Sequence, residues 1–196
     1  MSVLFTDDFN GEIYRILRCY SGRCFSLMIS GGSLLKCLDD GRYELLDTSR
    51  WSVFYSDERA DQSQLNHAAA HGFLKRIKAR VHPIHTSVPL DDAAIEYSKI
   101  LSDFVIDVCL LGIGGDGHIC SLLPECPELD SLQYVTALSG AFTVSPRRVS
   151  VTPKYINERV NELIFVVPNS NEKNVVQPDK SILARIRKEY VVILKK

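Results

Sequence analysis

The apolar run at residues 104–111, followed at once by glycines, constrains the fold of this chain more than any other feature. Its aliphatic and β-branched residues predict a strand buried on both faces, as in a parallel sheet. The glycines of residues 112–118 let backbone N–H groups approach a ligand closely, and two ionisable side chains, Asp116 and His118, stand among them. We therefore expect a phosphate-binding or catalytic turn at the end of this strand.

Three known motifs nearly match this turn, and each lacks an essential residue. The glycines fit a dinucleotide-binding pattern, but residues 131–157 hold no Asp or Glu that would bind a ribose. In the Walker A spacing, His118 stands where the phosphate-binding Lys belongs. A zinc deaminase needs H-x-E, and here Cys120 replaces the Glu. Nicotinamide binding, ATP hydrolysis and zinc-dependent deamination are therefore disfavoured.

Two other apolar runs also end in polar residues. Residues 25–29 lead into Ser30-Gly31-Gly32-Ser33, and residues 51–55 lead into Ser56-Asp57-Glu58-Arg59. Helical spacing of apolar residues follows each polar segment. The other expected elements are helices at about residues 64–78 and 91–102 and strands at residues 148–152, 162–167 and 190–194.

Alternating strands and helices predict an α/β fold with a mostly parallel sheet covered by helices on both faces. Ligands bind outside the carboxyl ends of the strands in such open sheets. The three polar turns at residues 30–33, 57–59 and 112–118 are therefore expected to meet at one cleft.

The composition excludes several classes of function. With 23 Lys and Arg against 24 Asp and Glu, the net charge is -1, which gives no electrostatic footprint for nucleic acid. No window approaches the roughly 18 apolar residues of a membrane span, and the acidic Asp7 and Asp8 argue against a signal peptide. We expect residues 1–196 to form a single domain. We also expect a cytoplasmic monomer with a small soluble ligand and no nucleic-acid or membrane partner.

The cysteines and histidines show no convincing metal-ligand spacing. Six cysteines lack paired C-x-x-C motifs and are expected to be free thiols. His67 and His71 lie four residues apart on an expected helix but lack a third ligand, which favours a solvated helix face. We expect neither a metal nor a cofactor.

Several segments, in a fixed order, resemble the 6-phosphogluconolactonase family. They are residues 30–33, the strand from Trp51 with Asp57-Glu58-Arg59, Asn66, residues 81–84, and Asp107 through Ser121-Leu122-Leu123-Pro124. Residues 145–157, with Arg147 and Arg148, are similar to the Pro-rich strand with paired arginines in that family. The likeness covers roughly residues 26–167. It implies a three-layer, Rossmann-like fold and hydrolysis of 6-phosphoglucono-1,5-lactone in the oxidative pentose phosphate pathway.

The related glucosamine-6-phosphate deaminases share the glycine turn with its Asp-Gly-His. They continue with Ala-Phe-Asn-Glu-Pro, whose Glu assists the histidine. This chain has Cys120-Ser121-Leu122-Leu123-Pro124, similar to the Ala-Ser-Leu-Phe-Pro of the lactonases. A lactonase is therefore favoured. A deaminase or other sugar-phosphate isomerase, and a sugar-phosphate binder without turnover, stay open as alternatives.

Lactone hydrolysis by water needs a general base, an oxyanion stabiliser and a phosphate anchor. The resemblance implies His118 as the base, with a helix-capping histidine as the alternative. Asp116 either orients the imidazole or bonds the N–H groups of its own turn. The expected substrate-binding residues are Gly31, Gly32, Ser33, Asp57, Arg59, Gly114, Gly115, Arg147, Arg148 and Lys173.

The expected roles of these residues follow from their chemistry. The glycines offer N–H groups to a phosphate or oxyanion, and arginines bind phosphate oxygens in a bidentate manner. Because neighbouring strand residues face opposite ways, only one of Arg147 and Arg148 is expected in the cleft, and the family pattern favours Arg148. Asp57 is expected to bind a substrate hydroxyl or act beside the base, with pairing to Arg59 or helix capping as the alternative. Ser33 either binds ligand or caps its helix.

Overall fold

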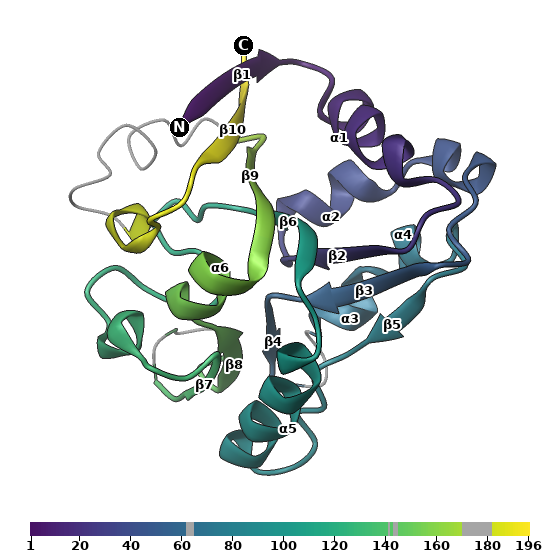
Figure 1. The fold of residues 1–196 in the computed structure, drawn as a ribbon. Helices are drawn as coiled ribbons and strands as arrows, with labels where there is room; N and C mark the ends of the chain where they lie inside the picture. Colours follow the sequence, from purple (N-terminus) through teal and green to yellow (C-terminus); the bar gives the residue numbers. More distant parts are fainter. Residues whose placement is uncertain (62–64, 141, 143–144, 170–181) are drawn as a thin grey trace.

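A parallel sheet of seven strands organises the molecule (Figure 1). The structure is a computed structural model that describes residues 1–61, 65–140, 142, 145–169 and 182–196. Within these residues, every neighbouring pair in the order β1-β10-β9-β6-β2-β3-β5 is parallel. The strands are β1 (Ser2–Thr6), β2 (Phe25–Ile29), β3 (Trp51–Tyr55), β5 (Arg80–His82), β6 (Ile106–Leu111), β9 (Val160–Val167) and β10 (Tyr190–Lys195).

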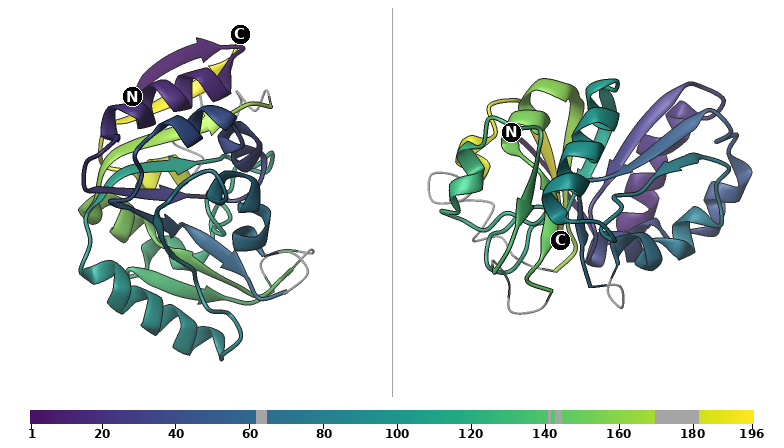
Figure 2. Two further views of the ribbon diagram at one scale, coloured as in Figure 1. Left: turned by 90° about the vertical axis from the view of Figure 1, so that its right-hand side faces the viewer. Right: turned by 90° about the horizontal axis from the view of Figure 1, so that it is seen from below.

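Helices cover both faces of this sheet, which makes three layers. Viewed from below, α1 and α2 lie on one face, and α5 and α6 lie on the other (Figure 2). The helices are α1 (Phe9–Leu17), α2 (Ser33–Leu38), α3 (Asn66–Ala69), α4 (His71–Leu74), α5 (Leu90–Ser102) and α6 (Pro153–Arg159). Short 3-10 helices are η1 (Arg18–Tyr20), η2 (Gly41–Leu45), η4 (Pro127–Asp130) and η6 (Ile182–Arg185). The predicted α/β fold with a mostly parallel sheet is confirmed.

A second, antiparallel sheet of three strands was not predicted. It has the order β4-β8-β7, with β4 (Asp57–Arg59), β7 (Val135–Leu138) and β8 (Arg148–Val151). Residues 57–59 were expected as a polar turn, yet they pair with β8. This second sheet places β7 and β8 beside β4, which follows the carboxyl end of β3.

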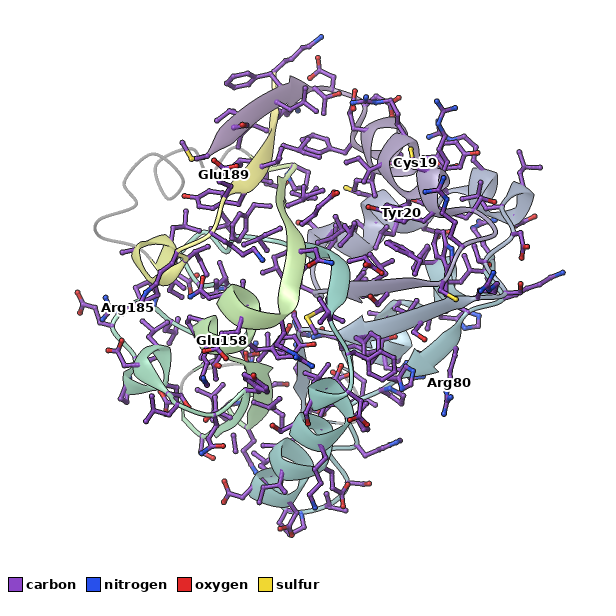
Figure 3. The ribbon with its side chains drawn as sticks, in the orientation of Figure 1. Cys19, Tyr20, Arg80, Glu158, Arg185 and Glu189 are labelled. Atoms are coloured by element: carbon purple, nitrogen blue, oxygen red, sulfur yellow. The ribbon has the colours of Figure 1, made fainter. Side chains whose placement is uncertain are left out.

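The core explains why the central strands were predictable. All residues of β2 are buried, and residues 108–111 of β6 are 0% exposed. Two of the buried aromatic side chains, Trp51 and Tyr97, have their polar atoms hydrogen-bonded to backbone carbonyls. The Trp51 indole N–H donates to the Tyr20 carbonyl at 3.1 Å, and the Tyr97 hydroxyl donates to the Tyr55 carbonyl at 2.9 Å. Charged side chains such as Arg80 and Arg185 lie at the periphery (Figure 3).

The helix expected at about residues 64–78 is broken into two short helices. Among the described residues of this segment, α3 ends at Ala69 and α4 begins at His71. Ala70 has φ -76° and ψ -2°, and the Phe73 N–H bonds the Ala70 carbonyl three residues back instead of four. The backbone therefore leaves the α-helical register at Ala70, which apolar spacing alone does not reveal.

Two other observations bear on the composition analysis. Within the described part of the chain, no helix is both long enough and apolar enough to cross a membrane. All six cysteines lie in described segments, and each is a free thiol.

Candidate active site

A cavity of about 330 Å³ lies where the carboxyl ends of β2, β6 and β9 meet the second sheet. Its lining includes residues 30–33 after β2, Asp57 and Arg59 from β4, and residues 112–115 with His118 after β6. The three polar turns that the sequence places at one cleft therefore share one cavity. Its volume is within the range of sites for small molecules.

The glycine turn after β6 is shaped to carry the histidine. The Gly112 N–H donates to the Ser30 hydroxyl at 3.0 Å, which ties this turn to the one after β2. The Gly114 N–H donates to the His118 carbonyl at 2.8 Å, which closes the loop. A Cβ atom on Gly114 would lie 2.2 Å from the His118 ring. Glycine is required here because the imidazole packs directly on the backbone.

His118, which lines the cavity, forms a hydrogen-bonded pair with Asp116. Nδ1 of His118 lies 2.5 Å from Oδ1 of Asp116, and the His118 backbone N–H donates to the same oxygen at 3.2 Å. Partial burial tends to raise the pKa of Asp116, but the hydrogen bonds and charge of His118 outweigh it and lower that pKa. The carboxylate accepts from Nδ1–H, which leaves Nε2 as the basic nitrogen. Asp116 therefore bonds both the imidazole and an N–H group of its own turn, the two contacts that the sequence left as alternatives.

The alternative of a helix-capping histidine is wrong, because a tight turn follows His118. Ile119 and Leu122 exchange backbone hydrogen bonds of 3.2 and 2.9 Å, and Cys120 has a φ of 54°. This turn buries Ser121 completely, with its hydroxyl donating to Oδ2 of Asp57 at 2.7 Å. The turn therefore joins the histidine segment to β4.

Asp57 is a buried carboxylate, 4% exposed, held from several sides. The Ser56 hydroxyl donates to its Oδ1 at 2.9 Å, and the Asn66 amide donates to its Oδ2 at 3.3 Å. Helix α3 is capped by Glu58, whose carboxylate accepts the backbone N–H groups of Asn66 and His67 at 2.6 and 2.8 Å. The capping role considered for Asp57 therefore belongs to its neighbour. Burial raises the pKa of Glu58 although three backbone N–H groups lower it.

Two arginines face each other across the β4–β8 pair. The register places Arg59 opposite Arg148, and both line the cavity. Like charges directly opposite each other disfavour the sheet, and an anion between them relieves the repulsion. Burial lowers the pKa of the Arg148 guanidinium; Asp57 opposes this effect, and Arg59 adds to it. Arg147 is exposed and does not line this cavity.

The turn after β2 contributes backbone groups to the cavity and no charged side chain. Gly32 has a φ of 75°, which favours glycine, and Gly32 rather than Ser33 is the N-cap of α2. The capping role considered for Ser33 is therefore wrong, and Ser33 lines the cavity as the first residue of the helix. A Cβ on Gly31 would lie 2.1 Å from the Asn66 side-chain oxygen. Close packing of this turn on Asn66 therefore requires glycine at position 31.

Two further residues were expected to bind substrate, and three residues near the cavity were not expected. Gly115 lines the cavity, and Lys173 lies outside the described residues. Asn66, Glu58 and Ser121, which position the lining, were not predicted as site residues. All three stand in the segments that carry the family resemblance, but no motif assigned them a role.

The fold and the cavity define an α/β protein that holds an imidazole and facing guanidinium groups at the carboxyl ends of its strands. The family model described as glucosamine-6-phosphate isomerases/6-phosphogluconolactonase matches residues 13–184, and the chain belongs to that family.

Individual relatives agree with this assignment. A probable 6-phosphogluconolactonase of Drosophila melanogaster is 31% identical over 179 residues, covering 85% of this chain and 72% of that protein. Probable 6-phosphogluconolactonase 2 of Oryza sativa subsp. indica is 29% identical over 179 residues, covering 76% of this chain. The chain spans 62% of the length of that rice protein. The crystal structure of 6-phosphogluconolactonase from Thermotoga maritima has the same fold, with a TM-score of 0.86, 21% identity and coverage of 100% of this chain and 99% of that one.

Proposed function

We propose that this protein hydrolyses 6-phosphoglucono-1,5-lactone to 6-phosphogluconate in the oxidative pentose phosphate pathway. The observation that carries the proposal is that His118, bonded to Asp116, lines the same cavity as the facing Arg59 and Arg148. The substrate has a carbonyl that water must attack and a remote phosphate that needs cations. The similarity to probable 6-phosphogluconolactonases of fly and rice supports the same reaction.

In the proposed mechanism, Nε2 of His118 takes a proton from water as the water oxygen bonds to the lactone carbonyl carbon. Asp116 stabilises the imidazolium that forms. Backbone N–H groups of the glycine turns stabilise the oxyanion, a role in which one donor typically contributes about 3 to 4 kcal/mol. The ring C–O bond then breaks, and the imidazolium returns its proton to the departing sugar oxygen. No metal or cofactor enters the proposal, because opening a lactone needs only modest activation.

The phosphate is proposed to lie between Arg59 and Arg148, whose guanidinium groups can bind its oxygens in a bidentate manner. Asp57 is proposed to act through Ser121, which donates to Asp57 and accepts from the Arg148 Nη1 at 3.4 Å. Gly31, Gly32 and Ser33 are proposed to contact the same ligand, since they line the same cavity.

Glucosamine-6-phosphate deamination is the alternative reaction within the family, and the residues after the histidine argue against it. The Glu that assists the histidine in the deaminases is replaced here by Leu123, and no carboxylate stands in residues 119–124. A sugar-phosphate binder without turnover is the other alternative, and the intact His118–Asp116 pair argues against it.

Two parallel assays test the proposal. A pH-stat follows acid release from freshly made lactone, corrected for spontaneous opening, while a second assay follows ammonia release from glucosamine 6-phosphate. We expect lactone hydrolysis that His118→Ala reduces by at least 100-fold, in line with the usual contribution of a positioned general base of roughly 10² to 10⁴. Ammonia release instead would favour the deaminase, and sugar-phosphate binding without either product would favour a binding protein.

We further propose that residues 1–196 act as one domain in a cytosolic monomer that engages neither nucleic acid nor membrane. The six free thiols support a reducing compartment. Size-exclusion chromatography with light scattering tests the monomer, and imaging of the tagged protein in its cell tests the compartment.

A further inference from the structure

Phe142 contacts two residues of the proposed site, although nothing in the sequence points to it. The Cζ atom of Arg148 lies 3.7 Å from the centroid of the Phe142 ring. The His118 ring centroid lies 5.2 Å from the same centroid, with the two ring planes at 80°. One aromatic side chain therefore touches both the proposed phosphate anchor and the proposed base.

The contact with Arg148 fixes the plane of its guanidinium. Cations stack on the faces of aromatic rings, and a planar guanidinium directs its N–H donors within its own plane. Hydrogen bonds to described residues also hold this group: Nε donates to the Ser145 carbonyl at 2.8 Å, and Nη1 donates to the Ser121 hydroxyl at 3.4 Å. The ring of Phe142, together with these hydrogen bonds, therefore fixes the direction of the guanidinium donors of Arg148, a residue that is 7% exposed.

The contact with His118 restrains the imidazole from a second direction. Asp116 fixes the Nδ1 side of the ring through the hydrogen bond of 2.5 Å. A hydrogen bond at one atom still permits the ring to tilt about that atom. The nearly perpendicular Phe142 ring limits this tilt, because edge-to-face aromatic pairs have a preferred geometry.

We propose that Phe142 is a positioning residue that holds the His118 imidazole and the Arg148 guanidinium in a fixed relative orientation. One substrate can then place its phosphate on the arginine and its carbonyl at the imidazole at the same time. A misplacement of about 1 Å in such an arrangement can cost on the order of 100-fold in rate. The inference rests on the proposed function, because it assigns a joint task to the two side chains.

The test compares Phe142→Leu with Phe142→Tyr. Leucine keeps an apolar side chain but removes the aromatic face, whereas tyrosine keeps the ring. For lactone hydrolysis we expect Phe142→Leu to raise KM about fivefold, the usual scale for a lost cation–π contact, and also to lower kcat. Phe142→Tyr should stay within about twofold of the original protein. A merely structural role would instead lower the melting temperature of both variants. It would not produce KM and kcat values that differ between Phe142→Leu and Phe142→Tyr.

A double-mutant cycle uses binding of 6-phosphogluconate, measured by calorimetry, and so needs no turnover. Arg148→Lys keeps the charge but loses the planar stack. If Phe142 acts through the guanidinium, Phe142→Leu weakens binding when Arg148 is present. The same substitution has a smaller effect in a protein that already carries Arg148→Lys, because the energies of residues in contact are coupled. Additive effects would overturn the inference.

The two measurements separate a failure of this inference from a failure of the proposed function. If the original protein binds 6-phosphogluconate but does not hydrolyse the lactone, the proposed function fails, and the cycle alone decides the role of Phe142. If it hydrolyses the lactone and Phe142→Leu leaves KM and kcat unchanged, the inference is overturned while the function stands. If the original protein neither hydrolyses the lactone nor binds 6-phosphogluconate, both are overturned.

Discussion

At the scale of single residues, the site depends on glycines, because a side chain at their positions would collide with functional groups. Gly114 has no side chain, and the His118 ring occupies the place where one would start, 2.2 Å from an ideal Cβ. The side-chain oxygen Oδ1 of Asp116 lies 2.6 Å from the same point. One glycine therefore permits the whole imidazole–carboxylate pair.

Gly114→Ala should displace this pair and lower kcat for lactone hydrolysis by at least tenfold. A contact below 3.0 Å with a ring and a carboxylate forces one of the two to move, and even small displacements are costly in catalysis. Steady-state kinetics measures the effect. Gly41→Ala is the matched control, since its Cβ would approach nothing closer than 3.7 Å. Normal turnover in Gly114→Ala would show that the pair is not needed in its present place.

Arg148→Ala should raise KM by on the order of ten- to a hundredfold, the range of a lost hydrogen bond to a charged group. Its effect on kcat should be smaller, because the phosphate is remote from the carbonyl and bound in both ground and transition states. Arg147→Ala provides the control, because Arg147 neighbours it in the chain but is exposed outside the cavity. Equal KM values for the two variants would remove Arg148 as the anchor.

At the scale of elements, apolar patterning predicts the strands that are buried on both faces. The runs at residues 25–29 and 51–55 coincide with β2 and β3 because central parallel strands are apolar along most of their length. Strand β4 holds only Asp57, Glu58 and Arg59. Its charges resemble a turn, and only pairing with β8, about 90 residues further on, makes it a strand.

Only part of the site could be predicted from the sequence. Glycines and ionisable residues that follow predicted strands can be found from the sequence, because the topology of the sheet brings strand ends together. The side chains that hold them are harder to find, because Glu58 belongs to the unpredicted sheet and Ser121 lies in irregular chain. Phe142 is an example, since it stands in no helix or strand and follows no periodic pattern.

Strand β5 carries a pH-dependent contribution to stability. His82 stacks on Phe54 with centroids 4.5 Å apart and an interplanar angle of 5°, and burial followed by the charge of Arg80 lowers its pKa below 6.5. The folded state therefore favours neutral His82. This contribution is fully present above pH 6.5 and is lost as the pH falls from 6.5 through the folded pKa.

Urea unfolding at pH 7.5 and at pH 5.0 should therefore show a smaller loss of stability in His82→Phe than in the original protein. Phenylalanine retains the stack but cannot be protonated. The other four histidines are common to both proteins, so the difference between the two pH dependences isolates His82. Identical pH dependences would contradict the assigned direction of the shift.

At the scale of the whole molecule, the cavity unites chain segments that are far apart in the sequence. Residues 30–33 follow the first central strand, His118 follows β6, and Arg148 belongs to the second sheet. The hydrogen bond between Ser121 and Asp57 already joins the histidine segment to that sheet. A phosphorylated ligand that touches all three segments would add a further connection between the two sheets.

Binding of 6-phosphogluconate should therefore stabilise the fold as a whole. A ligand at 100 times its Kd adds about 2.7 kcal/mol to the unfolding free energy, and 1 kcal/mol corresponds to roughly 2 to 4 °C in Tm for a chain of this size. We expect an increase of roughly 5 to 10 °C in the melting temperature, measured by differential scanning fluorimetry. The increase should be much smaller in Arg148→Ala at the same ligand concentration and unchanged in Arg147→Ala. Equal increases in all three proteins would place the phosphate away from the two facing arginines, and the joining of the two sheets by the ligand would then be wrong.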